Sequence, residues 1–359
     1  MKVLLMVPEM ELGGVEEGTY DLAIGLKNLG IEPIVVSGPG YYIQLLKEKN
    51  IKWYNLPTFK KNPVSFIFGY LKLKKILRKE KPEILHCRSR FPAWIAYYAL
   101  KFLPKTHFIT SIHGFYKKRY YSKILGKGER VIVISKSLEK YANRFLKVPS
   151  EKIRVVYNGV KFEPFINLKK NYHTGFIIGG IGRFTEVKGF QYLLFAVKKI
   201  NKKIPNIKVF LIGKGGYKKH LEKLVLKLNL ENVYFFEGKS FEFLPYFDVI
   251  IAPHISTEES VNEDFVWTGR VCIEAQLAGI PVITSLNGIE NGNFLKTSNT
   301  IFVPPKDSES LAKSIIYIFE NQEEVLQMCK NAKEFAIKNF SIDKMVKNTL
   351  EVYKEVLKM

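Results

Sequence analysis

The stretch FIIGGIGRFTEVKGFQYLLFAVKKINKK, residues 176–203, contains the unit of structure that decides the fold. It begins with a near-continuous apolar run, which is typical of a strand buried on both faces of a parallel sheet. A loop with Arg183, Lys188 and Gly189 follows, and apolar residues then recur at helical spacing from Phe190. A strand, a loop and a helix in this order predict an α/β sheet with helices packed on it.

The same alternation extends in both directions from this stretch. In the second half, strands are expected at 207–213, 232–238, 247–253, 280–285 and 299–305, and helices at 190–203, 218–229, around 274, 307–321, 323–339 and 341–359. In the first half, strands are expected at 2–8, 31–38, 83–89, 107–114 and 129–135, and helices at 13–30, 42–50, 66–81, 92–103 and 136–146. The segment 157–174 lacks a period and separates the two series, so the boundary between two doubly wound domains is expected near residue 170.

Composition and charge narrow the class of protein. The three cysteines, Cys87, Cys272 and Cys329, lack paired spacing, which disfavours a disulfide framework or a zinc site and favours a reducing cytosol. No apolar run reaches the ~18 residues of a spanning helix. Residues 1–170 hold 32 Lys and Arg against 13 Asp and Glu, while residues 171–359 hold 24 against 21. The net charge of +22 therefore belongs mainly to the first half and predicts an anionic surface or partner there.

Two features of the first half are candidates for binding. Gly13 and Gly14 lie between the first strand and the first helix, where backbone N–H groups can approach an anion, although a tight turn requires glycine as well. His113 follows a strand and could hydrogen-bond a substrate hydroxyl or move a proton, but a single histidine is more often structural.

Two loops of the second half carry cations and glycines at strand ends. Arg183 and Lys188 could bind a diphosphate, since arginine grips oxygens in pairs and lysine acts as a point charge. Surface charge is the competing interpretation. Gly213, Lys214 and Gly215 follow the next strand, where glycines free backbone donors or simply make a turn.

The stretch from Gly269 to Gly279 contains one acid, Glu274, on an otherwise apolar helix. Its carboxylate could accept two hydrogen bonds from ribose hydroxyls. It could equally form an i, i+4 ion pair with Arg270, worth a few tenths of a kcal/mol. This stretch alone leaves both interpretations open.

Taken together, these pieces resemble a retaining glycosyltransferase of family 4 with the GT-B fold. The resemblance covers nearly the whole chain and rests on the order of its motifs, which are ELGGVE, HCRSR, IHGFY, VIVISKSLEKY, IRVVYNGV, GRFTEVKG, FLIGKG, GRVCIEAQLAGIPVITS and FVPP. It implies two Rossmann-like domains facing a central cleft, with an acceptor-binding domain at 1–170 and a nucleotide-sugar-binding domain at 171–340. It also implies that the last helix, 341–359, crosses back to the first domain.

The resemblance implies a role for each matching residue. Gly13 and Gly14 would line the cleft near the donor phosphate and the acceptor, and His113 would reach the donor sugar. Arg183 and Lys188 would stabilise the leaving nucleotide. Other donor-binding positions would be Gly213, Lys214, Gly215, Gly238, Lys239, Gly269, Arg270 and Glu274. No metal or other cofactor is expected.

One position departs from the family pattern. The family commonly has two glutamates eight positions apart, and Val266 stands where the first would be. The acidic residues upstream, Glu258, Glu259, Glu263 and Asp264, are candidate substitutes for binding the donor sugar. This departure leaves the donor sugar open.

The expected activity is transfer of a hexose from a nucleotide-diphosphate sugar, with UDP favoured over GDP, to a lipopolysaccharide-type glycan or an anionic, lipid-linked acceptor. The basic first half predicts a cytoplasmic protein bound peripherally to the inner face of the cytoplasmic membrane. The alternatives are a GT-B epimerase or hydrolase of sugar nucleotides and a non-catalytic binding protein. A nucleic-acid partner is not expected, because no such motif occurs and the second half is nearly neutral.

Overall fold

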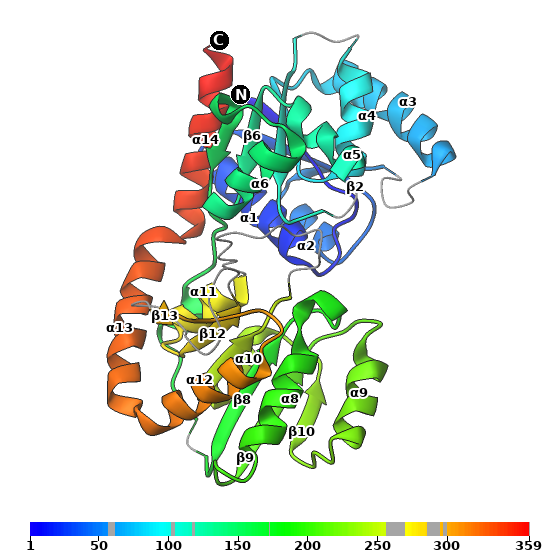
Figure 1. Ribbon diagram of the computed structural model, residues 1–359. Helices are drawn as coiled ribbons and strands as arrows, with labels where there is room; N and C mark the ends of the chain where they lie inside the picture. The colour runs from blue at the N-terminus through cyan, green and yellow to red at the C-terminus, as the bar shows by residue number, and fades with distance from the viewer. Residues whose placement is uncertain are drawn as a thin grey trace. The chain divides into compact units, whose positions relative to one another are not determined.

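A computed structural model describes residues 1–56, 62–101, 105–116, 119–171, 173–255, 270–285, 295–296 and 300–358. The chain forms two compact units, and Figure 1 shows their elements. Unit 1 comprises Met1–Gly159 and Phe340–Met359, and unit 2 comprises Val160–Asn339. The expected doubly wound α/β architecture is confirmed in each unit.

Unit 1 contains a parallel sheet of seven strands in the order β3-β2-β1-β4-β5-β6-β7. The strands are β1 (Lys2–Met6), β2 (Glu32–Ser37), β3 (Lys52–Asn55), β4 (Ile84–Cys87), β5 (His107–Ile112), β6 (Arg130–Val133) and β7 (Ile153–Val155). The helices are α1 (Gly14–Asn28), α2 (Tyr42–Glu48), α3 (Pro63–Glu80), α4 (Arg90–Leu100), α5 (Arg119–Ser122), α6 (Lys136–Leu146) and α14 (Ile342–Leu357), with the 3-10 turns η1 (Lys123–Lys127) and η2 (Ser150–Lys152). The short strands β3 and β7 were not predicted.

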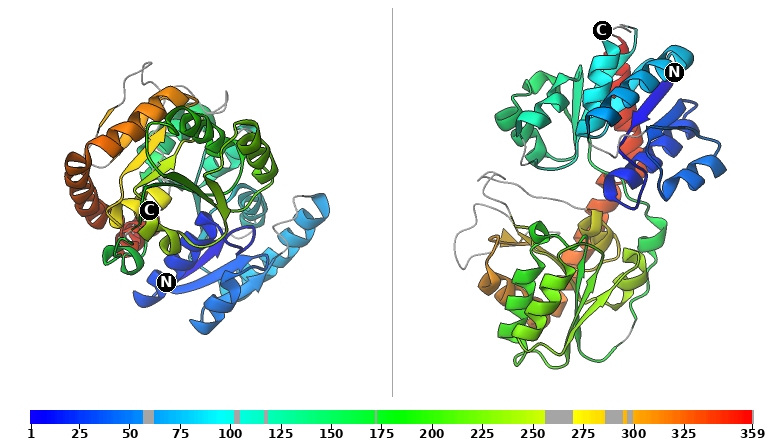
Figure 2. Two further views of the ribbon diagram at one scale, coloured as in Figure 1. Left: turned by 90° about the horizontal axis from the view of Figure 1, so that it is seen from below. Right: turned by 90° about the vertical axis from the view of Figure 1, so that its right-hand side faces the viewer.

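Helix α14, at the end of the chain, belongs to unit 1 and lies beside it in the views of Figures 1 and 2. The hydroxyl of the buried Tyr353 forms a hydrogen bond of 2.6 Å with Nδ1 of His86. Glu355 forms ion pairs with Arg130 and Arg154. Met345, Val346, Val352, Tyr353 and Val356 complete a core shared with β1, α1 and α2. The last helix is therefore part of the first unit's core.

Unit 2 contains a second sheet of seven strands in the order β10-β9-β8-β11-β12-β14-β13, of which β13 alone is antiparallel. The strands are β8 (Phe176–Ile181), β9 (Ile207–Ile212), β10 (Val233–Phe236), β11 (Val249–Ala252), β12 (Val282–Ser285), β13 (Leu295–Lys296) and β14 (Ile301–Val303). The helices are α7 (Glu163–Ile166), α8 (Phe190–Ile200), α9 (Lys218–Lys227), α10 (Ser240–Phe243), α11 (Arg270–Leu277), α12 (Ser308–Glu320) and α13 (Gln322–Asn339), with η3 (Glu186–Lys188) and η4 (Leu244–Tyr246).

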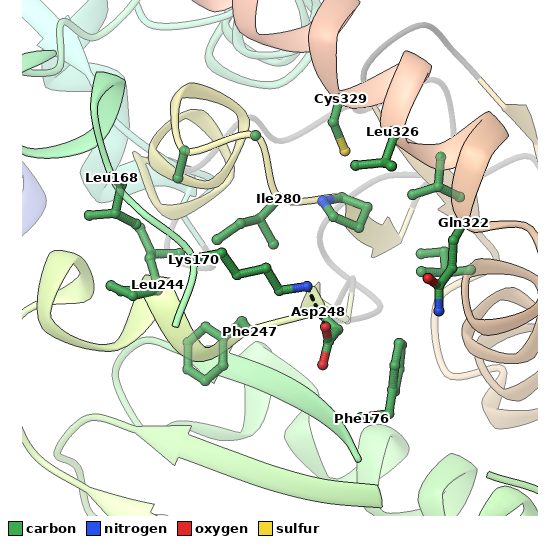
Figure 3. Close-up of a pocket in the computed structure, with 16 residues that line it drawn as sticks. Leu168, Lys170, Phe176, Leu244, Phe247, Asp248, Ile280, Gln322, Leu326 and Cys329 are labelled. Atoms are coloured by element: carbon green, nitrogen blue, oxygen red, sulfur yellow. Dashed lines mark hydrogen bonds and ion pairs between the residues drawn. The ribbon is translucent and has the colours of Figure 1, made fainter. Parts of the chain in front are cut away.

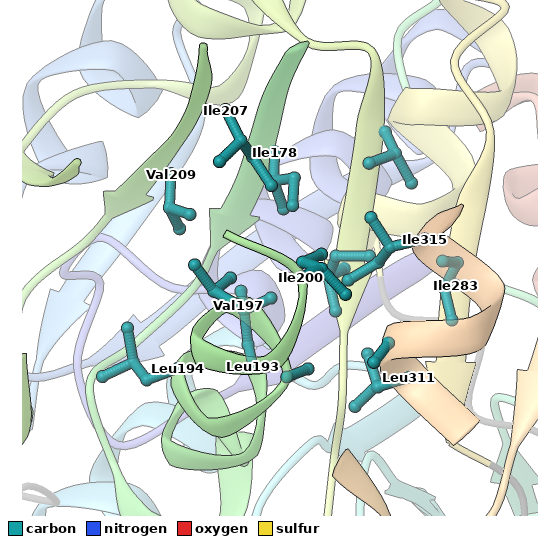
Figure 4. Close-up of a cluster of buried hydrophobic side chains, with 14 of the residues drawn as sticks. Ile178, Leu193, Leu194, Val197, Ile200, Ile207, Val209, Ile283, Leu311 and Ile315 are labelled. Carbon is teal, nitrogen blue, oxygen red and sulfur yellow. The ribbon is translucent and has the colours of Figure 1, made fainter. Parts of the chain in front are cut away.

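The core of unit 2 explains why the opening stretch folds as it does. Apolar side chains of α8, among them Leu193, Val197 and Ile200, meet Ile178 of β8 and Ile315 of α12 (Figure 4). These side chains are at most 1% exposed. A buried leucine or isoleucine contributes about 1.5–3 kcal/mol relative to its exposed state, so this cluster fixes the helix onto the strand.

The division between the units lies earlier than the expected boundary near 170. Residues 160–170 belong to unit 2, where the Lys333 ammonium donates a 2.6 Å hydrogen bond to the Ile166 carbonyl. Asn171 likewise donates its N–H to the Pro245 carbonyl at 2.8 Å. The segment therefore docks onto unit 2 through these hydrogen bonds and through buried side chains such as Phe165.

Candidate active site

The strand order of both units creates a switch point beside the first strand. In unit 2, β8 lies between β9 and β11, and the connections leave in opposite directions there. In unit 1, β1 lies between β2 and β4 in the same manner. Ligands of open α/β sheets bind beyond the carboxyl ends of the strands at this point. The loops after β8, β11, β1 and β4 are therefore the places to look for a site.

The loops after β8 and β11 meet through a lysine and a histidine. Lys188, on the 3-10 turn after β8, places its Nζ 2.9 Å from Nε2 of His254, which follows β11. His254 Nδ1 lies 3.0 Å from the Ala252 carbonyl and donates to it, so Nε2 carries the lone pair that accepts from Lys188. The two residues are 66 positions apart in the sequence.

The electrostatics of this pair keep the histidine neutral. Burial, then the charge of Lys188, lowers the pKa of His254 to about 3, while its hydrogen bond to Ala252 acts in the opposite direction. Burial also lowers the pKa of Lys188; Cys272 raises it and nearby Arg183 lowers it. The site therefore contains a partly desolvated ammonium next to a neutral imidazole, with the exposed Arg183 in the same loop. Such an arrangement attracts an anion strongly, because the charge is only partly shielded by water.

Glycines join the strand-end loops of unit 2 closely. Gly189 has φ +71°, and a Cβ there would lie 1.8 Å from the Pro253 carbonyl oxygen, directly before His254. A Cβ on Gly213 would lie 2.0 Å from the Gly182 carbonyl oxygen. Phe184 also donates its N–H to the Lys214 carbonyl at 2.8 Å. The glycines after β8 and β9 therefore hold the loops of Arg183 and Lys188 in place by close backbone approach.

Lys214 and Lys239 differ from Lys188 in their surroundings. The Lys214 ammonium lies 2.6 Å from Glu237, and its side chain is 76% exposed. Lys239 lies near the Phe241 ring, 5.8 Å from its centroid, and its N–H donates to Glu242. A Cβ on Gly238 would meet that same Glu242 carboxylate at 2.5 Å. Both lysines are surface groups, whereas Lys188 is partly buried.

Arg270 and Glu274 lie on α11 with Nε and Oε1 3.9 Å apart. Glu274 is buried, at 8% exposed. The structure thus contains the i, i+4 pair considered from the sequence, at a distance longer than a hydrogen bond. Gly269, Val266 and the acids Glu258, Glu259, Glu263 and Asp264 lie outside the described residues.

Unit 1 places a second group of polar side chains at its own switch point. Gly13 is the N-cap residue of α1 and Gly14 is its first residue, after β1. Arg88 follows β4 directly and is 5% exposed, and His113 follows β5. Burial, and then the Arg88 charge, lowers the pKa of His113 well below its usual value. The glycine loop follows β1 and His113 follows β5, and β4, which leads to Arg88, lies between these two strands in the sheet.

Comparison with known proteins agrees with this arrangement. Residues 12–163 match the family model described as Glycosyltransferase Family 4, and residues 162–335 match the model described as Glycosyl transferases group 1. The crystal structure of a glycosyltransferase from Rickettsia africae superposes on this chain with a TM-score of 0.83 at 28% sequence identity. The match covers 99% of this chain and 98% of the Rickettsia chain. The chain belongs to glycosyltransferase family 4.

Curated relatives of this glycosyltransferase include an uncharacterized glycosyltransferase of Methanocaldococcus jannaschii, 28% identical over 100% of this chain and 99% of the relative. An N-acetyl-alpha-D-glucosaminyl L-malate synthase of Bacillus anthracis is 25% identical over 80% of this chain and 78% of the relative. A UDP-Gal:alpha-D-GlcNAc-diphosphoundecaprenol alpha-1,3-galactosyltransferase of Escherichia coli is 24% identical over 85% of this chain and 84% of the relative. The Anabaena protein HepE, crystallised with UDP-glucose, shares the fold with a TM-score of 0.80 at 19% identity, each chain being fully covered. The chain is thus a glycosyltransferase with the GT-B fold.

The sequence prediction for this glycosyltransferase omitted two residues. The sequence prediction gave His254 no role, although it is a titratable residue directly after the strand expected at 247–253. Arg88 was quoted within HCRSR without a role. In both cases the available signal was position at a strand end, and only the fold showed that these ends lie at a switch point.

A cavity in unit 2 is separate from these strand ends. It has a volume of about 360 Å³ and lies where strands begin, near Phe176, Asp248 and Ile280 (Figure 3). Lys170 and Asp248 form an ion pair of 2.6 Å within it. Because the loops of Lys188 and His254 follow the opposite ends of the same strands, this cavity is separate from the Lys188–His254 pair.

The described part of the chain lacks two features, a metal-binding cluster and a membrane-spanning helix. Within those residues no cluster of three or more His, Cys, Asp or Glu side chains is arranged to hold a metal ion. The helices described there also include none with the length and apolarity needed to cross a bilayer.

Proposed function

We propose that this enzyme transfers a hexose from a UDP-sugar, with retention of configuration, to an anionic acceptor of the cell envelope, at a membrane surface. The observation that carries the donor half of this proposal is the Lys188–His254 pair at the switch point of unit 2. A desolvated ammonium beside Arg183 matches the charge of a nucleotide diphosphate, and the neutral His254 holds it without neutralising it.

The proposed chemistry uses the donor's own phosphate. The bond between the anomeric carbon and the phosphate oxygen breaks, and the acceptor oxygen bonds to that carbon on the same face. The acceptor hydroxyl loses its proton to the leaving phosphate oxygen, so no protein nucleophile is needed. Lys188 and Arg183 stabilise the negative charge that grows on the diphosphate, which lowers the barrier by electrostatic preorganisation.

The proposed identities of donor and acceptor have separate support. UDP is favoured because HepE was crystallised with UDP-glucose and the Escherichia coli relative is named for UDP-Gal. An anionic acceptor is favoured because the names of two relatives contain L-malate and a diphosphoundecaprenol, which are both anions. The excess of 32 basic over 13 acidic residues in 1–170 agrees with an anionic acceptor.

We expect the intact chain to be stabilised by a UDP-sugar more than by the matching GDP- or ADP-sugar in a thermal-shift screen. A ligand at about 100 times its Kd adds ~2.7 kcal/mol of stability. Stabilisation by GDP-sugars alone would contradict the choice of UDP. Turnover of the donor without acceptor would indicate an epimerase or hydrolase. Stabilisation without turnover on L-malate or a lipid diphosphate would indicate a binding protein.

Helix α3 supports binding to a membrane surface. Val64, Ile67, Phe68 and Leu71 are 51–63% exposed and lie on one helical face. The C-terminal half of the helix carries basic residues, of which Lys72, Lys75, Arg78 and Lys79 are exposed. The helix lies at the periphery of unit 1 (Figures 1 and 2). Exposed apolar side chains next to lysines are typical of helices that lie in the headgroup region of an anionic bilayer.

The double variant Ile67→Asp/Phe68→Asp is expected to bind anionic vesicles at least tenfold more weakly, because each large apolar side chain contributes about 1.5–3 kcal/mol when fully buried. Cosedimentation with phosphatidylglycerol vesicles at low salt measures this effect. Leu226→Asp, at an apolar residue of α9 that is 75% exposed, is the control and should leave binding unchanged. Equal loss in both variants would contradict docking through α3.

A further inference from the structure

Arg88 is a buried cation that the glycosyltransferase reaction as described above does not use. It follows β4 at the switch point of unit 1, and its N–H continues the ladder by donating to the Met6 carbonyl at 2.9 Å. The side chain is 5% exposed, and its buried Nε has no hydrogen-bond partner among the described residues. A buried guanidinium normally satisfies all its donors, because desolvating an unpaired charge costs several kcal/mol.

The Arg88 guanidinium packs against helix α1. A Cβ on Gly18 would lie only 3.3 Å from Nη2, so a small residue at this position lets the guanidinium approach the helix closely. Helix α1 has no side-chain cap at Gly13. His113, at the end of β5, has a buried Nε2 that also lacks a partner in the described part of the chain. Two strand ends thus present buried nitrogens without a partner among the described residues, and one of them, that of Arg88, belongs to a guanidinium that lies against helix α1.

The charges near Arg88 compensate it only in part. Burial lowers the pKa of the guanidinium to about 10, whereas Tyr353, Glu16 and Asp21 act to raise it. Even at this pKa the group is charged at neutral pH. Arg90, two residues on, has partners: its guanidinium lies 4.2 Å from the Tyr116 ring centroid and donates to Ser122 Oγ at 3.3 Å.

We propose that Arg88, with His113 beside it, binds one oxyanion of the acceptor, a phosphate or a carboxylate. The planar fork can donate two parallel hydrogen bonds to such a group. The oxyanion would supply the hydrogen-bond acceptor that the buried Nε lacks. This inference rests on the proposed function, because it assigns the anionic end of the acceptor to unit 1 while the donor diphosphate belongs to unit 2.

The test uses the intact protein with UDP at saturation, so that the diphosphate loop of unit 2 is occupied. Inorganic phosphate and L-malate are titrated separately by calorimetry, since one represents a phosphate and the other a carboxylate. Either anion should bind wild type, and Arg88→Gln should weaken that binding at least tenfold. Arg90→Gln, which removes the same charge nearby, should change it less than twofold. Binding of only one anion would identify the source of the oxyanion.

Stability and UDP affinity separate this proposal from other roles of Arg88. Without anions, Arg88→Gln should have an unchanged or higher Tm, because an unpaired buried charge is removed. A large fall in Tm would instead identify a structural arginine and overturn the proposal. Arg88→Lys, which keeps the charge but loses the fork, should show intermediate anion affinity and tests the proposal if Arg88→Gln does not fold.

The affinity for UDP itself distinguishes a failure of the acceptor role proposed for Arg88 from a failure of the donor role proposed for unit 2. It should be unchanged in Arg88→Gln. Weaker UDP binding in that variant would show that Arg88 holds the donor phosphate, and the acceptor assignment would fall. If wild type binds UDP but neither anion, the acceptor assignment again fails and the donor proposal stands. If wild type does not bind UDP at all, the proposed donor fails first.

Discussion

Replacing Lys188 with methionine is expected to lower kcat/KM for sugar transfer by roughly two to three orders of magnitude, the usual effect of removing one preorganised electrostatic contact. Methionine keeps much of the length and apolar stem of lysine but removes the charge. Lys188 is partly desolvated, is held 2.9 Å from His254, and lies at the switch point of unit 2. The negative charge of the diphosphate grows as the sugar leaves, so we expect a larger fall in kcat than in UDP affinity.

Steady-state kinetics with a UDP-sugar, together with calorimetric titration of UDP, measures both quantities. Lys218→Met is the matched control. Lys218 also lies in unit 2, but its ammonium is near Glu222 on the same helix at 3.8 Å. The Lys218→Met variant should retain kcat/KM within about twofold, because such exposed ion pairs contribute little to stability. Weaker UDP binding with an unchanged kcat would show that Lys188 contacts only the ground state, and normal turnover would remove it from the site.

Gly189→Ala is expected to destabilise unit 2 by roughly 3 kcal/mol. An alanine at φ +71° costs about 1–2 kcal/mol by itself. The added Cβ would also lie 1.8 Å from the Pro253 carbonyl oxygen, so the loop after β11 must move. For a unit of this size such a change lowers Tm by roughly 6–12 °C.

This substitution should affect binding as well as stability. Gly189 follows Lys188 and Pro253 precedes His254, so separating the two loops also separates the lysine from the histidine. UDP affinity should therefore fall at temperatures where the variant is still folded. Gly216→Ala is the control, since a Cβ there meets nothing within 4 Å. Calorimetric unfolding that shows equal Tm values for both variants would contradict the close approach of the two loops.

Most strands were predictable because strands buried on both faces appear as near-continuous apolar runs. The strands that escaped prediction, which are β3, β7 and the two-residue β13, lack this property. Two of them lie in unit 1. β3 is the four-residue segment KWYN, and β7 is the three-residue segment IRV. Each lies at an edge of the sheet of unit 1, where burial is lower and pairing is with one neighbour only. Such segments are too short for an alternation of apolar and polar residues to be recognised.

The candidate site was predictable in part for a related reason. Parallel strands end at the same edge of a sheet, so the cations and glycines after β8 and β9 could be grouped without coordinates. That reasoning favoured Lys188 together with Arg183, but it could not show how the burial of Lys188 and Lys214 differs, because both are lysines in strand-end loops. The fold separates them: Lys214 forms an exposed pair with Glu237, whereas Lys188 turns towards His254.

The sequence by itself determined the order of strands and helices, the glycines of the strand-end loops and the cations that follow β8, since these depend on local periodicity and on neighbours in the chain. The tertiary structure alone decided which charges are buried and which residues they meet. Lys188 and His254 are 66 positions apart, and His86 and Tyr353 are 267 apart. Burial and pairing depend on long-range packing, and for that reason His254 and Arg88 became visible as candidate site residues only in the folded chain.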